Sequence, residues 1–299
     1  MTESRRTPPV PPRSRAPRAP RIPDPPGHAE LAALLDLAVA AARAGGVELV
    51  HRAGHATGIA FKSTATDPVS DADRAGEAAV VGLLSTERPE DGFLGEEGTD
   101  RAGSSGFRWV IDPLDGTVNY LYGIPHTAVS VACEQRSGES WHAVAGVVHD
   151  PARGETFTAA LGQGACLNGR PLWVNDPVDP ASALVATGFA YSSGARARQG
   201  AAAAALLPRV RDLRCGGSAA LDLCWVAAGR CDAYYEDELG RWDWAAGALI
   251  AAEAGAVVTP LGNGVAAAGP ALHAELTGLL APFAAPFAAP FAAPPAAPA

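Results

Sequence analysis

The sequence predicts an α+β subdomain followed by an α/β subdomain, packed tightly together with an active site in the crevice between them. Residues 28–180 carry two helical patterns and then several short apolar runs separated by turn residues. Residues 181–280 instead alternate between strand-length apolar runs and helical patterns. Hydrophobic residues make up 48% of the 299 positions, which suffices for a sizeable core.

The first subdomain is predicted to begin with helices and continue as a meander. Apolar residues recur at helical spacing over 29–44 and 73–84, and the polar run Ser70-Asp71 introduces the second helix. The strand patterns that follow are short and separated by turn residues, which is typical of antiparallel strands. They cover residues 107–111, 128–133, 143–148 and 155–159.

The second subdomain is predicted from its alternation. Strands are expected at 184–187, 233–235 and 256–258, and helices at 201–207, 219–228 and 244–254. Strands that alternate with helices indicate an α/β arrangement.

Both ends of the chain lack a burial pattern. Residues 1–27 are rich in proline and arginine, and residues 281–299 repeat Pro-Phe-Ala-Ala, so we expect two disordered tails. The chain has no run of 18 uncharged apolar residues, and no hydrophobic segment follows its N-terminal arginines. We therefore expect no membrane span and no secretory signal, and a cytoplasmic location.

Charge and cysteine content exclude other classes. A formal net charge of -9 argues against a nucleic-acid groove and leaves carboxylates to gather around cations. Five cysteines without a C-x-x-C pair argue against a disulfide framework or structural zinc. We expect all five to be reduced packing residues: Cys133, Cys166, Cys215, Cys224 and Cys231.

The strongest local motif is WVIDPLDGT at residues 109–117. An apolar strand runs into Asp112, which the next proline keeps extended, so Asp112 and Asp115 are predicted in a tight turn beyond the strand end. Gly116 permits a sharp bend, and Thr117 can begin a helical turn whose free N–H groups bind phosphate. Alone, the motif also fits a strand-ending turn with solvated aspartates.

Further acids strengthen the functional interpretation. Glu96 and Glu97 follow a short apolar run, and in an extended segment they must point to opposite sides, so only one can enter a shared site. Asp243 precedes the helix expected at 244–254, where a carboxylate is favourable even without a function. Like charges about 4 Å apart repel by roughly 4 kcal/mol, so clustered carboxylates call for cations. Ligands that are all oxygen select magnesium or manganese over zinc.

Lys62 is the only lysine among 23 basic residues. It is either a chance survivor in an arginine-biased chain or a position that needs a compact ammonium group. Residues 62–73 place several acids beside it. Because no lysine follows a glycine-rich turn, the chain has no P-loop.

Three motifs carry a resemblance to a known family. Gly-Glu-Glu at 95–97, Asp-Pro-Leu-Asp-Gly-Thr at 112–117 and Trp-Asp-Trp-Ala-Ala-Gly at 242–247 occur in the order found in the inositol monophosphatase family. The chain resembles this lithium-sensitive, magnesium-dependent phosphatase group over residues 29–280. The resemblance implies a layered α-β-α-β-α sandwich of the inositol monophosphatase and fructose-1,6-bisphosphatase type. It also implies that the six residues between Val258 and Val265 shorten a peripheral hairpin.

The resemblance also implies roles for individual residues. The implied metal ligands are Glu96, Asp112, the Leu114 carbonyl, Asp115 and Asp243. Asp73 and Thr117 match the pair that activates the attacking water, and Lys62 and Asp67 match polar residues near a loosely held metal, so the catalytic set is Asp73, Thr117, Glu96 and Lys62. The implied substrate contacts are Asp115, Gly116, Thr117, Gly217, Ser218, Ala219, Ala220, Glu236 and Asp243, with Glu236 accepting from sugar hydroxyls.

The function implied is hydrolysis of a small phosphate monoester, first of all inositol monophosphate, by a water that two or three Mg²⁺ ions activate. Mn²⁺ would substitute, and Li⁺ would inhibit. Histidinol phosphate and 3'-phosphoadenosine 5'-phosphate are alternative substrates. A homodimer is implied, with no nucleic-acid or membrane partner. The alternative to an enzyme is a non-catalytic protein that binds the transcription or translation machinery.

Overall fold

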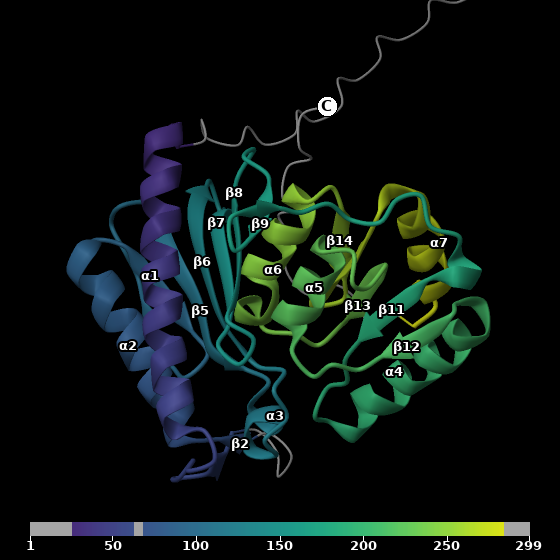
Figure 1. Cartoon of the computed structure of the whole chain (residues 1–299), viewed down its shortest axis with the longest axis horizontal. Coiled ribbons are helices and arrows are strands. Elements are labelled where there is room, and N and C mark those ends of the chain that lie inside the picture. The colour runs from purple at the N-terminus through teal and green to yellow at the C-terminus, as the bar shows by residue number, and fades with distance from the viewer. Residues whose placement is uncertain (1–25, 63–67, 284–299) are drawn as a thin grey trace, which may run out of the picture.

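The computed structural model describes residues 26–62 and 68–283, and these build five alternating layers of helix and sheet (Figure 1). Helices α1 and α2 cover the outer face of an eight-stranded sheet, α5 and α6 fill the space between the two sheets, and α4 and α7 cover a five-stranded sheet. This arrangement confirms the α-β-α-β-α sandwich. No described helix is long and apolar enough to cross a membrane.

The helices are α1 (His28–Arg52), α2 (Asp71–Glu87), α3 (Thr117–Leu121), α4 (Ser193–Leu206), α5 (Ala219–Ala227), α6 (Arg241–Glu253) and α7 (Pro270–Leu280). A short hairpin, β1 (Ala60–Phe61) with β2 (Pro68–Val69), precedes α2. The strands of the first sheet are β3 (Gly92–Gly95), β4 (Asp100–Arg101), β5 (Phe107–Asp115), β6 (Ala128–Ser137), β7 (Ser140–Asp150), β8 (Glu155–Ala160), β9 (Ala165–Leu167) and β10 (Arg170–Pro171). Those of the second are β11 (Leu184–Thr187), β12 (Asp212–Arg214), β13 (Ala233–Glu236), β14 (Val257–Leu261) and β15 (Gly264–Ala268).

The first sheet contains the predicted meander. Its strand order is β10-β9-β8-β7-β6-β5-β3-β4, antiparallel from β5 to β10, with β3 parallel to β5. One prediction was wrong: β5 does not end before the aspartates. It continues to Asp115, with a register irregularity between Asp112 and Asp115, because β6 continues to pair with it past Ile111.

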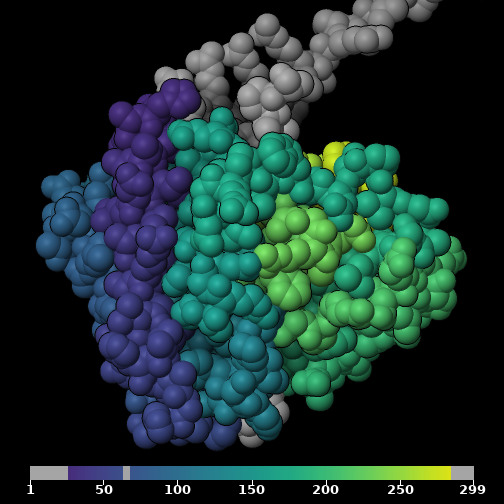
Figure 2. Space-filling model, viewed as in Figure 1, coloured from purple at the N-terminus to yellow at the C-terminus, as the bar shows by residue number. Residues whose placement is uncertain are grey.

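Helix α1 (His28–Arg52) is longer than the predicted range of 29–44, which ended just before Gly45-Gly46. These glycines lie inside the helix, where it packs closely on its neighbours. A Cβ atom on Gly45 would lie 3.0 Å from a Val80 methyl group, and one on Gly46 would lie 2.6 Å from the His149 ring. The helix lies at the surface as a purple ridge beside the first sheet (Figure 2). The two glycines thus allow close contact along this ridge.

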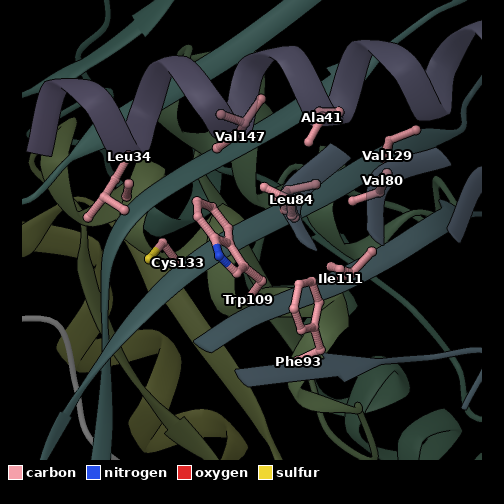
Figure 3. Packing of buried hydrophobic residues seen from close by; sticks show 14 of the residues in the cluster. Leu34, Ala41, Val80, Leu84, Phe93, Trp109, Ile111, Val129, Cys133 and Val147 are labelled. Carbon is pink, nitrogen blue, oxygen red and sulfur yellow. The ribbon is translucent and has the colours of Figure 1, made fainter. Parts of the chain in front are cut away.

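The core beneath α1 and α2 is built around Trp109 of β5 (Figure 3). The Trp109 side chain is fully buried, and its indole N–H donates to Asp91 at 2.9 Å, which satisfies its one polar atom. Cys133, Cys224 and Cys231 are buried, as packing residues should be. Cys215 was predicted wrongly, because it is exposed in a loop.

Helix α6 lies between the sheets and packs closely through small residues. A Cβ atom on Gly146 of β7 would lie 3.1 Å from the Ala246 backbone, and one on Gly247 would lie 2.9 Å from Leu223 of α5. Residues 244–251 are all buried. The sequence Trp-Ala-Ala-Gly therefore matches a helix with protein on every side.

The second sheet has the order β12-β11-β13-β15-β14, in which β11, β12 and β13 are parallel. The predicted strands and helices are present. The sequence did not reveal β12, β15 and α7. For β15 the reason is that residues 264–268 are small and buried on both faces, so they show no alternation. The hairpin is also not peripheral: β15 lies between β13 and β14, where Val265 is paired with Glu236.

The ordered part of the chain extends beyond the predicted tail boundary. Phe283 packs, half-buried, against the cluster under α4 and α7, and Pro26 is buried. The remaining tail predictions, for residues 1–25 and 284–299, lie outside the described residues. The division into subdomains near residue 180 remains a proposal.

A chain of residues 26–283 should unfold at the same temperature as the full-length protein, because the four hydrophobic clusters among the described residues lie between Leu31 and Phe283. Ending the chain at Ala281 should lower the free energy of unfolding by about 1 kcal/mol, because the half-buried Phe283 ring is lost. Thermal unfolding of the three chains tests this. Equal stability of the two shortened chains would contradict the packing of Phe283.

Candidate functional site

A cleft of about 900 Å³ lies between the two halves of the fold. Residues of β5 and α3 line one side, and the loops before α4, α5 and α6 line the other. Of the predicted site residues it brings together Lys62, Glu96, Asp112, Leu114, Asp115, Gly116, Thr117, Gly217, Ser218, Ala219, Glu236 and Asp243. Asp67 lies outside the described residues, and Asp73 is buried behind the wall of the cleft.

The irregular end of β5 aims its two aspartates differently. Asp112 Oδ1 accepts the Leu114 N–H at 2.9 Å, within its own strand. Asp115 Oδ2 reaches the second half of the chain, where it accepts from the Ser218 hydroxyl at 2.6 Å and the Ala220 N–H at 2.7 Å. Gly116 has φ +97°, and a Cβ atom there would lie 2.9 Å from the His126 carbonyl oxygen. Only glycine fits this position.

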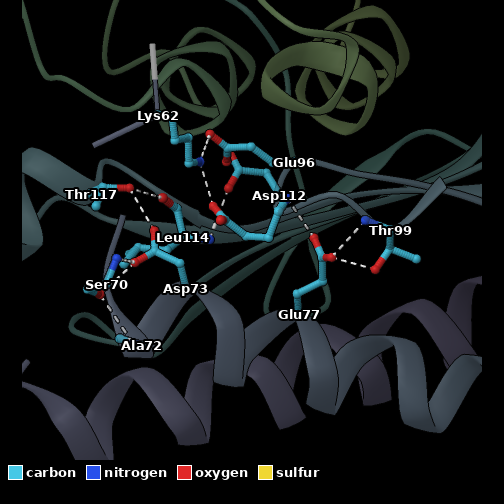
Figure 4. Close-up of polar contacts among 11 residues, drawn as sticks. Lys62, Ser70, Ala72, Asp73, Glu77, Glu96, Thr99, Asp112, Leu114 and Thr117 are labelled. Carbon is cyan, nitrogen blue, oxygen red and sulfur yellow. Dashed lines mark hydrogen bonds and ion pairs between the residues drawn. The ribbon is translucent and has the colours of Figure 1, made fainter. Parts of the chain in front are cut away.

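Thr117 connects the cleft to a buried acid (Figure 4). It is the first residue of α3, as predicted, and its hydroxyl oxygen lies 2.9 Å from Asp73 Oδ1 and 3.1 Å from the Leu114 carbonyl. The other Asp73 oxygen caps α2 by accepting from the Ser70 N–H at 2.8 Å and the Ser70 hydroxyl at 2.6 Å. Asp73 is therefore fixed while it accepts from Thr117.

The prediction that Glu96 and Glu97 point to opposite sides was wrong. They lie in a turn after β3 rather than in an extended segment, and the Lys62 ammonium donates to both, at 2.8 Å and 2.5 Å. The lone lysine thus binds both acids, and of the two only Glu96 lines the cleft, so the expectation that one of them enters the site is met (Figure 4 shows Lys62 beside Glu96). Burial alone would lower the pKa of Lys62, but the two carboxylates raise it above its ordinary value.

Glu77 supports this turn and was missed by the sequence argument. It projects from α2 and accepts from the Glu97 N–H at 2.9 Å, the Thr99 N–H at 3.1 Å and the Thr99 hydroxyl (Figure 4). A Cβ atom on Gly95 would lie 2.5 Å from its carboxylate, so glycine is needed before Glu96. The available signal was an acid on the apolar face of the helix.

Asp243 and Glu236 close the cleft from the second half of the chain. Asp243 lies in the first turn of α6, and its Oδ2 accepts the Gly240 N–H at 2.7 Å. Asp243 therefore caps the N-terminus of α6 and also lines the cleft as a predicted metal ligand. Glu236 ends β13, and its Oε2 accepts the Tyr234 hydroxyl at 2.8 Å. Residues 236–238 are all acidic, but they do not form an exposed acidic run, because Asp237 is buried and Glu236 is half-buried.

The acids of the cleft raise one another's pKa. Burial is the largest cause of the raised pKa of Asp112 and of Asp243, and the charge of Glu96 follows in both cases. Burial also raises the pKa of Asp115 to about 7, although the Ser218 and Ala220 donors oppose this shift. The cleft thus holds more negative charge than Lys62 alone can balance.

The residues present fit divalent cations by the chemistry of their donors. Burial and the charges of Glu96, Asp115 and Asp243 raise the pKa of Asp112, and a bound cation would offset this repulsion. The carboxylate and carbonyl oxygens around them are the ligands that Mg²⁺ and Mn²⁺ prefer. As they stand, no three described acid, histidine or cysteine side chains form a finished metal cage. Protein donors hold one oxygen of each of the three aspartates instead.

Other motifs carry no chemistry. Cys224 and Arg230 have the spacing of a cysteine phosphatase loop, but Cys224 is buried within α5, so these residues form no phosphate-binding loop. His51 and His55 are exposed around the end of α1, as expected for a solvated helix end. The acidic cleft is the remaining candidate among the residues that the structure describes.

The chain is thus a five-layered α-β-α-β-α sandwich with an acid-lined cleft between its two halves. A model of the inositol monophosphatase family matches residues 30–285, so the chain belongs to that family. Membership supports phosphatase activity.

Individual relatives agree with this assignment. The chain is 48% identical to an inositol-1-monophosphatase of Mycobacterium leprae over 75% of this chain and 82% of the relative. It is 41% identical to a Nus factor SuhB of Pseudomonas aeruginosa over 76% and 84% of the two chains. The crystal structure of the extragenic suppressor protein suhB from Bartonella henselae has a TM-score of 0.77 at 36% identity, covering 83% of this chain and 98% of that one.

Replacing Glu77 by glutamine should lower the free energy of unfolding by about 2–3 kcal/mol, because charge-assisted hydrogen bonds to the turn are weakened. Glu48→Gln, which breaks a surface ion pair with Arg52, should cost less than about 1 kcal/mol. Urea unfolding of both variants measures the difference. Glu77 supports the turn only if its variant is clearly the less stable.

Proposed function

We propose that the chain hydrolyses small phosphate monoesters, most readily inositol monophosphate, with Mg²⁺ as its cofactor. The observation that carries the proposal is the convergence of the five predicted metal ligands, Thr117 and Glu236 on one cleft. These residues come from four separate stretches of the chain, namely Glu96, residues 112–117, Glu236 and Asp243, so the fold has to bring them together. The cleft also has room for a small ester.

Glu96, Asp112, the Leu114 carbonyl, Asp115 and Asp243 would hold the two or three metal ions. When bound, such ions neutralise the phosphate charge and lower the pKa of a bound water. Mn²⁺ should substitute because it prefers the same oxygen donors, and the resemblance adds Li⁺ as an inhibitor.

Thr117 and Asp73 would orient the attacking water. Because the Thr117 hydroxyl donates to Asp73, its lone pairs are left to accept a hydrogen bond from water in the cleft. A proton can then pass from the water through the hydroxyl to the buried carboxylate. Lys62 would keep Glu96 in place and add one positive charge near the phosphate.

Glu236 and the segment 217–219 would recognise the alcohol part of the ester. Burial raises the pKa of Glu236 to about 8; the Tyr234 hydroxyl opposes the shift, and Asp222 and Asp115 add to it. A half-buried carboxyl group can accept from neighbouring ring hydroxyls, which favours a polyol ester. An ammonium group would also suit it, so histidinol phosphate is the main alternative, with 3'-phosphoadenosine 5'-phosphate after it.

A binding role in transcription is a second candidate, favoured by the relatives named Nus factor SuhB. The intact cleft supports the enzyme. Relatives named inositol-1-monophosphatase are 42–48% identical to the chain and those named Nus factor SuhB are 41–43% identical, so the two ranges overlap and the cleft carries the choice. A homodimer is proposed on the family resemblance, and the cytoplasmic location expected from the sequence also stays a proposal.

The three candidate substrates and an aryl phosphate, assayed with Mg²⁺, test the proposal. We expect the largest kcat/KM for inositol 1-phosphate and no turnover in chelator. If histidinol phosphate is hydrolysed most efficiently, the alternative substrate is correct. Purified protein that hydrolyses none of them with Mg²⁺ or Mn²⁺ would refute the enzyme and favour the binding role.

Asp112→Asn should abolish turnover while the protein stays folded. The change removes a charge that would hold the cations, and so it acts on the transition state and lowers kcat. Circular dichroism and thermal unfolding check the fold. Because repulsion among the acids falls, the metal-free variant should be at least as stable as the wild type. Retained activity would refute the ligand assignment.

Glu236→Gln should weaken hydrolysis of inositol 1-phosphate selectively, and the effect should grow with pH. Below its pKa of about 8 the wild-type group is mainly neutral, like glutamine, whereas above it the group is an anion that accepts more strongly. We expect about a tenfold loss of kcat/KM at pH 9, a smaller loss at pH 7, and little change for an aryl phosphate. Equal losses on both substrates would contradict polyol recognition.

A further inference from the structure

Glu134 of β6 is a fully buried carboxylate that the proposed chemistry does not use. Two guanidinium groups bind it. Arg108 of β5 donates to its Oε2 through Nε at 2.8 Å, and Arg241 donates to its Oε1 through Nε at 2.6 Å and through Nη2. A buried charge is tolerated only when it is paired, so neither arginine can leave without cost.

Arg241 is the first residue of α6 and lies two residues before Asp243. Its guanidinium also lies 3.8 Å from the centroid of the Trp244 ring. A planar guanidinium with two donors on one oxygen fixes orientation as well as distance. The N-terminal turn of α6 is therefore held against β6.

A second contact connects the same turn to β6. The Ser130 hydroxyl donates to the Trp242 carbonyl at 3.2 Å. In the sheet, Ser130 is the register partner of Asp112, and Glu134 is the register partner of Arg108. The strand pair β5–β6 thus holds three predicted metal ligands, Asp112, Leu114 and Asp115, and anchors the turn that carries another, Asp243.

We propose that Glu134 and Arg241 are positioning residues that set Asp243 against the acids of β5 and so determine metal affinity. This inference rests on the proposed function, because it treats Asp243 as a ligand. Residues that orient a ligand without touching the metal typically change metal affinity by about 10- to 100-fold when replaced. The brace formed by Glu134 and Arg241 acts through helix α6, because Asp243 follows Arg241 within one rigid turn.

The chain offers a matched control. Arg230 and Glu155 form a two-pronged ion pair, 2.6 Å at each prong, that also joins the two halves of the fold. It lies beyond the C-terminal end of α5, whereas the cleft is at the N-terminal end of that helix. Arg230 also contacts aromatic rings, Phe157 and Trp225. Arg230→Gln therefore removes a similar cross-connection away from Asp243.

The test measures Mn²⁺ binding by calorimetry for the wild type, Arg241→Gln and Arg230→Gln, with thermal unfolding in chelator as the check on folding. Arg241→Gln leaves Glu134 paired with Arg108, so the variant should fold. We expect its Mn²⁺ affinity to fall by about tenfold or more, against less than about twofold for Arg230→Gln. Glu134→Gln, where it folds, should match Arg241→Gln.

Equal losses in the two arginine variants would overturn the inference, because they would show general loosening. An unchanged Mn²⁺ affinity in Arg241→Gln would overturn it as well. The proposed function fails separately: a wild type that binds Mn²⁺ but hydrolyses no phosphate monoester refutes the phosphatase and leaves the brace intact.

Discussion

Repulsion among carboxylates that share one cleft is the constraint on which the rest of the structure depends. Without support the acids would turn outward to water. The fold holds each of them with a donor close by: a backbone N–H for Asp112, the loop before α5 for Asp115, and the helix cap for Asp243. Lys62 does the same for Glu96. The site is thus oriented before any cation binds.

Both halves of the chain contribute residues to the site. Asp112 and Asp115 belong to the first sheet, whereas Ser218 and Asp243 lie at the N-terminal ends of α5 and α6. Asp115 is the connecting residue, because its hydrogen bonds cross from β5 to the start of α5. Stability and function are therefore linked, since separating the halves would also separate the predicted ligands.

Sequence reasoning worked where pattern and chemistry were local. The motif at 109–117, the amphipathic helices and the meander all have a spacing that reports their structure. It failed where long-range packing decides. Gly45 and Gly46 read as a helix end but permit close packing, β15 is buried on both faces, and Glu96 turns because Glu77 holds the next residues. Glu134 carried no signal, because its partners Arg108 and Arg241 are far apart in the sequence.

The small residues of α6 also affect the width of the cleft, although they do not line it. Gly146 of β7 lets Ala246 of α6 pack directly against the first sheet, and Gly247 lets α6 pack directly against α5, so these close contacts set how far α6 lies from the first sheet. The distance between the acids of β5 and Asp243 is therefore set by methyl groups that never meet a substrate. Relatives that differ in these methyl groups would differ in the width of the cleft, and so in the size of the cation or ester that they accept, with every ligand unchanged.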